Sequence, residues 1–251
     1  MSKKVLIIGG CGYIGSALYL HLLKRGYELT TVDLEYFGNY VNPNNIKQDF
    51  YLLEPSFYKQ FDVVILLAGM SSVKLSEDNL LGTFNNNVRN FVDLLLKLSP
   101  NQRFLFASSS SIYGRTDVKN VTESNRFFEA TNWYDLSKAI IDNIAALTNL
   151  NYASLRFGTL SGYSPNLRTD ILINAMVNSA KEKGKIEVYN SGIHRPLLAM
   201  KDCLRAFEYL IEDKDNHRGV FNLASLNCTV DEAANTVGEI MQVPVEIKEG
   251  Q

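Results

Sequence analysis

The stretch GGCGYIG, residues 9 to 15, follows the apolar run VLIIG and precedes an amphipathic segment. Gly9 permits a tight turn, Gly12 lets a backbone approach a pyrophosphate, and Gly15 allows a helix to pack closely on a strand. The amides at the start of that helix would face the phosphates, because the positive end of the helix dipole favours an anion. The stretch therefore predicts a strand, a glycine turn and a helix that together bind a dinucleotide.

An acidic residue follows at the spacing that such a site requires. Asp33 ends the second apolar run, LTTVD, close to the roughly 20-residue spacing expected of the acid that binds an adenosine ribose. A carboxylate accepts a hydrogen bond from the 2'-hydroxyl and repels a 2'-phosphate, which favours NAD over NADP. A glycine turn without a ligand is the alternative for the glycine stretch alone, and a nearby base could reverse the preference for NAD. No basic residue immediately follows Asp33.

Short apolar runs alternate with amphipathic segments through the first two thirds of the chain. The runs are typical of strands buried on both faces, and they cover residues 5 to 9, 29 to 33, 61 to 69, 104 to 110 and 152 to 158. Apolar positions recur at helical spacing in residues 15 to 26, 87 to 98 and 134 to 149. This order predicts an α/β protein with a doubly wound parallel sheet, the Rossmann fold.

The pattern changes after about residue 158 to loops that carry Gly, Pro and Asn, followed by short elements. We therefore expect an NAD-binding Rossmann domain over residues 1–158 and a smaller C-terminal substrate-binding lobe over residues 159–251. The short elements lie near residues 170 to 183, 186 to 189, 201 to 212 and 229 to 241, and some of the late ones are expected to return to the Rossmann core. No flexible linker separates the two parts.

Composition and charge narrow the class of protein. With 251 residues, 46% hydrophobic and 21% charged, the chain is long enough for one sizeable core. Its net charge of -2 gives no electrostatic reason to expect nucleic acid or a membrane as partner. Three cysteines without CxxC spacing, and a His194 without partners at metal spacing, argue against disulfides and a metal site. No apolar run suits a signal peptide or a membrane span, so a cytoplasmic protein is expected.

Hydroxyl and amine groups gather in two later stretches. Tyr134 and Lys138 lie in NWYDLSK, four residues apart, so on a helix they share a face. With 13 tyrosines in the chain, one such pair can arise by chance. The run FLFASSSSIYG, however, ends a predicted strand on four serines, 108 to 111. Ligands of open α/β sheets bind outside the carboxyl ends of strands, so these hydroxyls are expected to face the dinucleotide site.

Taken together, these residues resemble an extended short-chain dehydrogenase/reductase of the NAD-dependent sugar epimerase/dehydratase family, from Lys4 to about Ile247. The supporting motifs are the glycine stretch with Asp33, SSSSIYG and YDLSK. Four further stretches resemble the family's pattern, namely QDF at 48 to 50, LLAG at 66 to 69, LRFG at 155 to 158 and HRPLLAMKD at 194 to 202. The resemblance implies NAD as cofactor, a nucleotide-diphosphate sugar as substrate and a homodimer.

The resemblance implies three catalytic residues, Ser109, Tyr134 and Lys138. Tyr134 is similar to the catalytic tyrosine, and Lys138 to the lysine that binds the nicotinamide ribose and lowers the phenol's pKa. A phenol with a reference pKa of about 10 is a poor base at neutral pH, and a neighbouring ammonium and the nicotinamide charge both favour its ionised form. Tyr134 can then take a proton from a sugar hydroxyl while Ser109 holds the oxygen.

The resemblance also implies binding residues. For the cofactor they are Gly9, Gly12, Tyr13, Ile14, Gly15, Asp33, Asp49, Phe50, Leu67, Ala68, Gly69, Asn87, Tyr134 and Lys138. For the substrate they are Ser71, Ser110, Tyr163, Arg168 and Arg195. Arg195 resembles a residue that contacts the diphosphate, a task suited to a guanidinium fork, and a surface salt bridge is its alternative.

Several positions depart from the family's pattern and leave three functions open. Gly158 stands where many epimerases have Asn, Ser71 where galactose epimerases have Lys, and Ala199 where the family often keeps His. The first reading is a nucleotide-sugar 4-epimerase that transiently oxidises C4. The second is a related reductase, dehydrogenase or dehydratase, although Ser110 and Ser111 replace the Asp-Glu pair of the 4,6-dehydratases. The third is a dinucleotide-binding module without chemistry, but such proteins commonly lose the tyrosine or the lysine.

Overall fold

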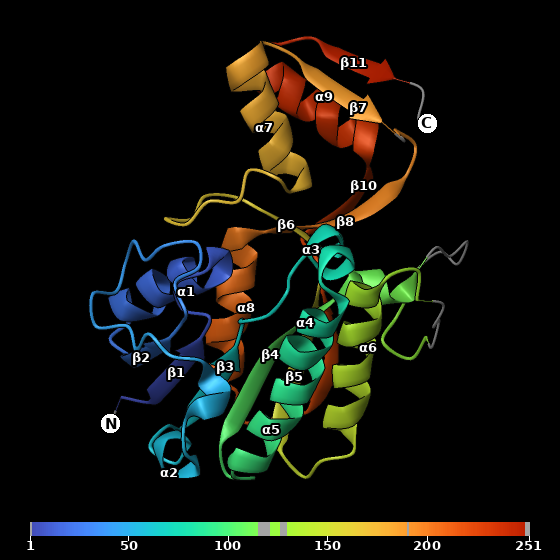
Figure 1. Ribbon diagram of the computed structural model, residues 1–251. Coiled ribbons are helices and arrows are strands. Elements are labelled where there is room, and N and C mark those ends of the chain that lie inside the picture. Colours follow the sequence, from blue (N-terminus) through green and yellow to red (C-terminus); the bar gives the residue numbers. More distant parts are fainter. Residues whose placement is uncertain (1, 115–120, 126–129, 190, 249–251) are drawn as a thin grey trace.

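A six-stranded parallel sheet forms the centre of the protein, in a computed structural model that describes residues 2–114, 121–125, 130–189 and 191–248. The strands follow the order β2-β1-β3-β4-β5-β9 (Figure 1). Their bounds are β1 Lys4–Ile8, β2 Glu28–Val32, β3 Val63–Leu66, β4 Arg103–Ser109, β5 Asn151–Phe157 and β9 Gly219–Leu223. The chain order reverses between β1 and β3, and a crevice for a ligand is expected at the carboxyl ends of the strands there.

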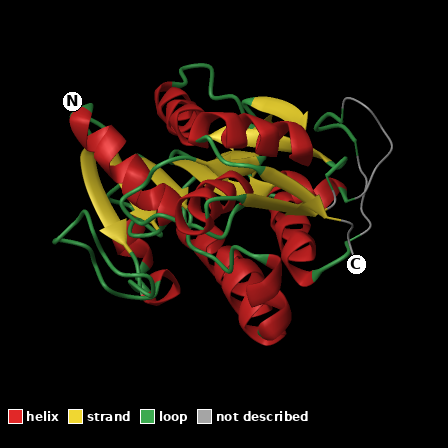
Figure 2. Cartoon of the chain, turned by 90° about the horizontal axis from the view of Figure 1, so that it is seen from above, coloured by secondary structure: helices red, strands yellow, loops and turns green. Residues whose placement is uncertain are grey.

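Helices cover both faces of this sheet, as Figure 2 shows from above. One face carries α1 (Tyr13–Lys24) and α8 (Met200–Glu212), and the other carries α5 (Asn90–Lys97) and α6 (Trp133–Ala146). Strand β1 sends Leu6 into the core under α5 and Val5 into the core under α1. Because successive strand residues point to opposite faces, burial on both faces explains why these strands are continuous apolar runs.

The predicted doubly wound parallel sheet is confirmed, with its five predicted strands in place. The main difference in extent is the predicted strand 61 to 69, which is extended only over Val63–Leu66. The amides of Leu67 and Ala68 both donate to the carbonyl of Ile8, at 2.8 and 3.0 Å. The chain therefore bends toward β1 at the carboxyl end of the sheet.

The second lobe stands above the carboxyl ends of the sheet (Figure 1). It contains α7 (Leu172–Lys183), α9 (Val230–Met241) and the parallel pair β7 (Ile186–Tyr189) and β11 (Val245–Lys248), with an apolar core of its own. A three-stranded sheet of β6 (Thr159–Ser161), β8 (His194–Ala199) and β10 (Leu226–Thr229) lies between the two lobes. Among the late elements, α8 packs on the six-stranded sheet and β9 forms one of its edge strands.

The segment between β3 and α5 is mostly helical, and the sequence predicted helix there only from residue 87 onward. It contains α3 (Val73–Asp78), α4 (Leu80–Phe84) and a π-helical turn, Asn85–Arg89. The shorter α2 (Pro55–Tyr58) precedes β3. Within the part of the chain that the structure describes, no helix is both long enough and apolar enough to cross a bilayer.

Candidate active site

The glycine turn joins β1 to α1 as its spacing predicts. Gly9 has a φ of +86°, a conformation that favours glycine, and a Cβ there would lie 2.5 Å from the Ala68 nitrogen. A Cβ on Gly15 would lie 2.0 Å from the carbonyl oxygen of Gly9. These two positions therefore exclude any side chain, and the helix starts directly against the strand.

Gly12 is different, and its surroundings fit a phosphate group. A Cβ on Gly12 would meet only the Gly9 carbonyl oxygen, at an ordinary contact distance of 3.4 Å. Packing therefore does not demand glycine here, and the open side remains for a ligand. Gly12 is also the N-cap of α1, and no side chain accepts a hydrogen bond from an amide of the first turn at this position. The first-turn amides, which include those of Tyr13, Ile14 and Gly15, can thus serve an anion.

The acidic residue at the end of β2 is held in place by two backbone amides. The Asp33 carboxylate accepts from the Cys11 amide at 3.0 Å and from the Glu35 amide at 2.7 Å. Lys47 forms an ion pair with Glu35 at 3.2 Å. The sequence reading found no base immediately after Asp33, but the fold brings Lys47 close. The Glu35 carboxylate forms an ion pair with Lys47, so the charge of Lys47 is balanced by Glu35 and Asp33 remains a negative group at the ribose site. This arrangement fits NAD.

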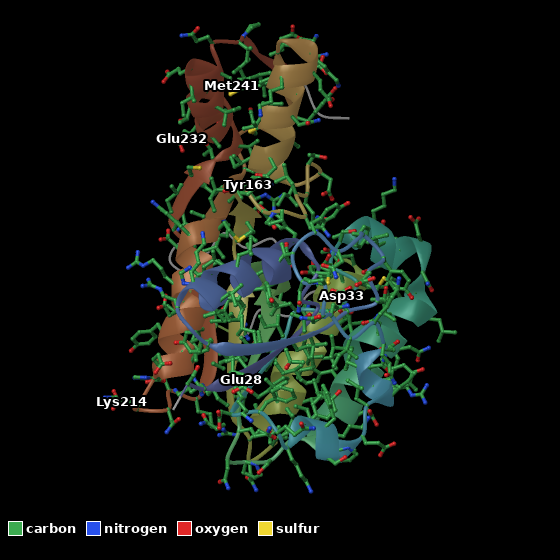
Figure 3. The ribbon with its side chains drawn as sticks, turned by 90° about the vertical axis from the view of Figure 1, so that its left-hand side faces the viewer. Glu28, Asp33, Tyr163, Lys214, Glu232 and Met241 are labelled. Carbon is green, nitrogen blue, oxygen red and sulfur yellow. The ribbon has the colours of Figure 1, made fainter. Side chains whose placement is uncertain are left out.

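A segment of the second lobe lies across this site, and we call residues 162–170 the strap. Asn166 donates to the carbonyls of Cys11 and Phe37, at 2.7 and 3.2 Å. These carbonyls belong to the glycine turn and to the loop after β2. The buried Ser164 donates to the Tyr13 carbonyl at 2.6 Å. The strap therefore joins both walls of the predicted dinucleotide site, and Figure 3 shows Tyr163 at the junction of the lobes above Asp33.

The loop after β3 is fixed from below by Asn87. Its amide accepts from the Met70 nitrogen at 2.8 Å, donates to the Met70 carbonyl at 3.0 Å, and donates to Ser137 at 3.0 Å. A side chain at position 69 would clash, because a Cβ on Gly69 would lie 2.9 Å from the side-chain oxygen of Asn87. Asn87 thus ties the loop at Met70, next to Gly69, to α6, the helix that carries Tyr134.

The QDF stretch, residues 48 to 50, follows Ile46, which pairs with Val32 at the end of β2. Phe50 is buried in the core beneath the sheet, where the hydroxyl of Tyr58 donates to its carbonyl. Its side chain is therefore a packing residue. Asp49 is half-buried, and burial raises the pKa of its carboxyl. A cofactor contact from this stretch would accordingly come from Asp49.

The proposed catalytic residues meet at the carboxyl end of β4. Ser109 is the last residue of β4, and Tyr134 lies in the first turn of α6, which Asn132 caps by accepting from the Asp135 amide at 2.9 Å. The Lys138 ammonium lies 5.9 Å from the centre of the Tyr134 ring. It donates to the Ala107 carbonyl at 2.8 Å, which leaves its other N–H groups available.

The surroundings of Tyr134 within the protein raise the pKa of its phenol above the usual value of 10.0, so the neutral phenol is favoured. Burial raises the pKa of Tyr134, and the charge of Asp135 raises it further, whereas Arg168 lowers it. After burial, the largest influence on this pKa is the Ser109 side chain, whose hydrogen bond lowers it. A bound cation near the ring, such as the nicotinamide, would therefore be needed to favour the phenolate.

A buried acid lies beneath Lys138. Asp142, one turn along α6, accepts from Ser108 at 3.0 Å, from Ser154 at 2.5 Å and from the guanidinium of Arg156 at 2.8 Å. Burial lowers the pKa of Lys138 to about 8, and the charge of Asp142 opposes this decrease. Lys138 is thus a buried cation whose proton is weakly held.

This burial predicts a pH-dependent cost to stability. The unfolded lysine keeps its proton up to a pKa near 10.5, whereas the folded one loses it near pH 8. Between these values the unfolded chain binds more protons, so stability rises with pH. We expect Lys138→Met to be more stable than the unmodified protein below pH 8. That advantage should shrink by about 3 kcal/mol between pH 8 and pH 10.5.

Denaturant unfolding of both NAD-free proteins across this range measures the difference. Other groups titrate equally in both proteins and cancel. A gap that stays constant with pH would show that Lys138 is not a buried cation.

Two of the predicted substrate residues meet near Tyr134, across the mouth of the site. Arg168 of the strap donates to the Ser71 hydroxyl at 3.2 Å and pairs with Asp170 at 2.6 Å. Its charge reaches the Tyr134 phenol. Ser71 itself lies in the loop after β3 and is exposed.

The other predicted substrate residues are less engaged. The side chains of Tyr163 and Arg195 are exposed and make no hydrogen bond or ion pair with the described part of the chain. Ser110 is half-buried in the turn after β4. Gly158 follows β5, and a Cβ there would lie 2.8 Å from the Pro196 carbonyl oxygen. The asparagine that many epimerases have at this position would require a backbone shift.

Three residues near the site were missed by the sequence reading. Asp135 accepts from the hydroxyl of Ser111, Asn166 bridges the cofactor walls, and Asp142 lies beneath Lys138. Asp135 and Asp142 share α6 with Tyr134 and Lys138, so their helical spacing was a visible signal. Asn166 contacts Cys11 across 155 positions of sequence, and no local pattern indicates it.

A parallel doubly wound sheet, a glycine turn with an acid after β2, and a Tyr/Lys pair beside a strand-end serine define a dinucleotide-binding short-chain dehydrogenase/reductase. The chain matches the model of the NAD dependent epimerase/dehydratase family over residues 5–224. It belongs to that family, whose cofactor is NAD.

Individual relatives agree with this assignment. UDP-glucose 4-epimerase of Yersinia enterocolitica is 28% identical over 76% of this chain and 66% of its own length. UDP-glucose 4-epimerase 2 of Arabidopsis thaliana is 32% identical over 57% of this chain and 47% of its own length. The matches thus span about half to two thirds of these relatives. In fold, the chain is similar to the UDP-glucose 4-epimerase of Thermus thermophilus in complex with NAD, with a TM-score of 0.80, 20% identity and coverage of 98% of this chain and 86% of that one.

Proposed function

We propose that the protein is an NAD-dependent nucleotide-sugar 4-epimerase with Tyr134 as its base. The observation that carries the proposal is the meeting of Tyr134, Lys138 and Ser109 at the carboxyl end of β4, beside the glycine turn and the loop after β3. Relatives named as UDP-glucose 4-epimerases support the choice of reaction.

The chain's own residues divide the chemistry among them. NAD, when bound, accepts a hydride and gives it back. Tyr134 takes the proton of the sugar's C4 hydroxyl and later returns it, the task of a general base and acid. Lys138 places an ammonium beneath the ring, which favours the phenolate. Ser109 holds the oxygen at C4.

The nucleotide-sugar site would lie between the lobes. Arg168 and Ser71 already meet at its mouth, and Ser110 lies beside Ser109. We propose Tyr163 and Arg195, which the described structure leaves exposed, as contacts to the nucleotide and its diphosphate. A guanidinium suits a diphosphate because its planar fork donates two parallel hydrogen bonds.

A dehydratase or reductase of the same family is the second candidate. The observation that favours a dehydratase is the carboxylate of Asp135, which is hydrogen-bonded to Ser111 beside the proposed base. It places an acid near the position where the 4,6-dehydratases carry theirs. A module without chemistry is less favoured because Tyr134 and Lys138 are both present and adjacent.

A panel of UDP-, GDP-, CDP- and dTDP-sugars, incubated with the protein and followed by NMR, separates these functions. We expect one substrate to yield its C4 epimer. A 4-keto-6-deoxy product would identify a dehydratase, and no conversion of any sugar would support the binding module.

The ribose site predicts the choice between NAD and NADP. We expect the unmodified protein to bind NAD more tightly than NADP, because a carboxylate facing a 2'-phosphate repels it. Asp33→Ala should reduce the ratio of the two affinities by about tenfold. Calorimetric titration of both nucleotides measures it. Glu28→Ala, at the opposite end of β2 (Figure 3), is the matched control. Tighter binding of NADP by the unmodified protein would refute this assignment of Asp33.

We further propose that the protein forms a homodimer. We also propose that it is cytoplasmic and that its two domains divide at residue 158. Support for the dimer comes from a run of exposed apolar side chains over α3 and α4, which pack beside α6. These are Val73, Leu75, Leu80, Leu81 and Phe84. We expect light scattering to give twice the 28.2 kDa chain mass, and Leu81→Glu to give one chain mass. A monomeric unmodified protein would disprove the dimer.

A further inference from the structure

The loop after β2 carries a second carboxylate close to Asp33. Glu35 follows two residues later, and its amide donates to the Asp33 carboxylate at 2.7 Å. Glu35 has a φ of +58°, in the left-handed region that residues with a side chain seldom adopt. Such a conformation costs free energy and persists only where the surrounding structure enforces it. The contacts of the Glu35 side chain show what enforces it.

Two asparagine side chains hold the Glu35 carboxylate. Asn39 and Asn45 donate to the same oxygen, Oε1, at 2.9 and 3.1 Å. The Asn39 oxygen accepts from two backbone amides of the loop, and the Asn45 NH₂ group also donates to the Asp33 carbonyl at 3.1 Å. Both NH₂ groups must therefore face Glu35. These two donors fix Oε1, and Oε2 is left for another partner.

Lys47 is that partner, and its backbone lies beside Asp33. A parallel bridge pairs Val32 with Ile46, and each of these residues precedes one of the two charged residues. Neighbouring strands are about 4.8 Å apart, so the four-carbon stem of Lys47 is long enough to bring its ammonium to the Asp33 side chain. The ammonium instead pairs with Oε2 of Glu35, at 3.2 Å. Exposed ion pairs are weak partly because two flexible side chains must be ordered, and Glu35 is ordered already.

We propose that Glu35 is a specificity-determining residue that keeps Lys47 away from the 2' position of the adenosine ribose. An ammonium is a common ligand of phosphate, so a free Lys47 beside Asp33 would favour a cofactor with a 2'-phosphate. Two acids then select NAD in different ways, because Asp33 repels the 2'-phosphate and Glu35 withholds the base that would bind it. This inference rests on the proposed placement of the ribose at Asp33, and no step of the epimerase reaction enters it.

Glu35→Gln tests the proposal. Its amide oxygen still accepts from both asparagines, whereas an NH₂ group replaces Oε2 and releases the Lys47 ammonium. We expect the ratio of NADP to NAD affinity, measured by calorimetric titration, to rise about tenfold, the value of one hydrogen bond to a charged group. In a Lys47→Met background the same substitution removes only the charge of the acid, and the ratio should rise by no more than about threefold. A loosened loop affects both nucleotides and cancels in the ratio.

Glu28→Gln is the matched control. Glu28 pairs with Lys4 at 3.6 Å, at the opposite end of β2 from Asp33 (Figure 3), so losing an acid there should leave the ratio unchanged. No rise in Glu35→Gln, or an equal rise with and without Lys47, would overturn the proposal. Lys47→Met alone is a second check, since a tenfold fall in the ratio would mean that Lys47 already serves the phosphate. Asp33→Ala tests the ribose placement separately, so the two failures are distinguishable.

Discussion

Tyr134→Phe is expected to lower turnover by about 10²–10⁴-fold, the contribution typical of a general base. The substitution removes only the phenolic oxygen. The ring stays over Lys138, and Ser109 and Asp135 keep their partners. NAD affinity and thermal stability should therefore remain close to those of the unmodified protein. Initial rates with the sugar identified by NMR, together with calorimetric titration of NAD, measure both quantities.

Tyr209→Phe is a matched control, since it removes the same oxygen from an exposed tyrosine on α8. It should leave the rate unchanged. If Tyr134→Phe retained near-normal activity, the proton would have to be taken by another group. The pairing of Tyr134 with Lys138 would then be a coincidence of helical spacing.

The sequence predicted the parts of the fold that local chemistry determines. A glycine turn between an apolar run and an amphipathic helix has few alternatives, because Gly9 and Gly15 are in contact with backbone atoms that no side chain could approach. The serines at the end of β4 and the Tyr/Lys pair were likewise found by position alone. Each of these features is specified within a single strand, turn or helix.

The remainder depends on contacts between distant segments. Strand β9 was missed because its short run GVFNL follows the change of pattern after residue 158, yet it pairs with β5 at the sheet edge. Ser111 and Asp135 are 24 positions apart. Their hydrogen bond requires that β4 and α6 end side by side, which only the packed sheet decides.

The protein as purified is expected to retain NAD and to interconvert a C4-hydroxyl pair of nucleotide sugars with no net NADH. An epimerase removes and returns a hydride within one cycle, so its cofactor need not leave, whereas a reductase must exchange cofactor at every turnover. The strap fits the first case, because Asn166 and Ser164 fasten it to both walls of the cofactor site. Denaturing the protein and measuring released NAD, with absorbance of NADH followed during turnover, tests this.

Weakening the contacts of the strap should let bound NAD exchange with NAD in solution. Asn166→Ala removes hydrogen bonds to Cys11 and Phe37, each worth about 0.5–1.5 kcal/mol, so NAD release is expected to quicken by on the order of tenfold. Asn235→Ala, exposed on α9 in the second lobe, should leave release unchanged. Stoichiometric NADH consumption with a 4-keto sugar, or NADH production from a sugar, would instead identify the reductase or dehydrogenase. In that case the strap must open at every turnover, and Asn166→Ala would raise the rate wherever cofactor exchange limits it.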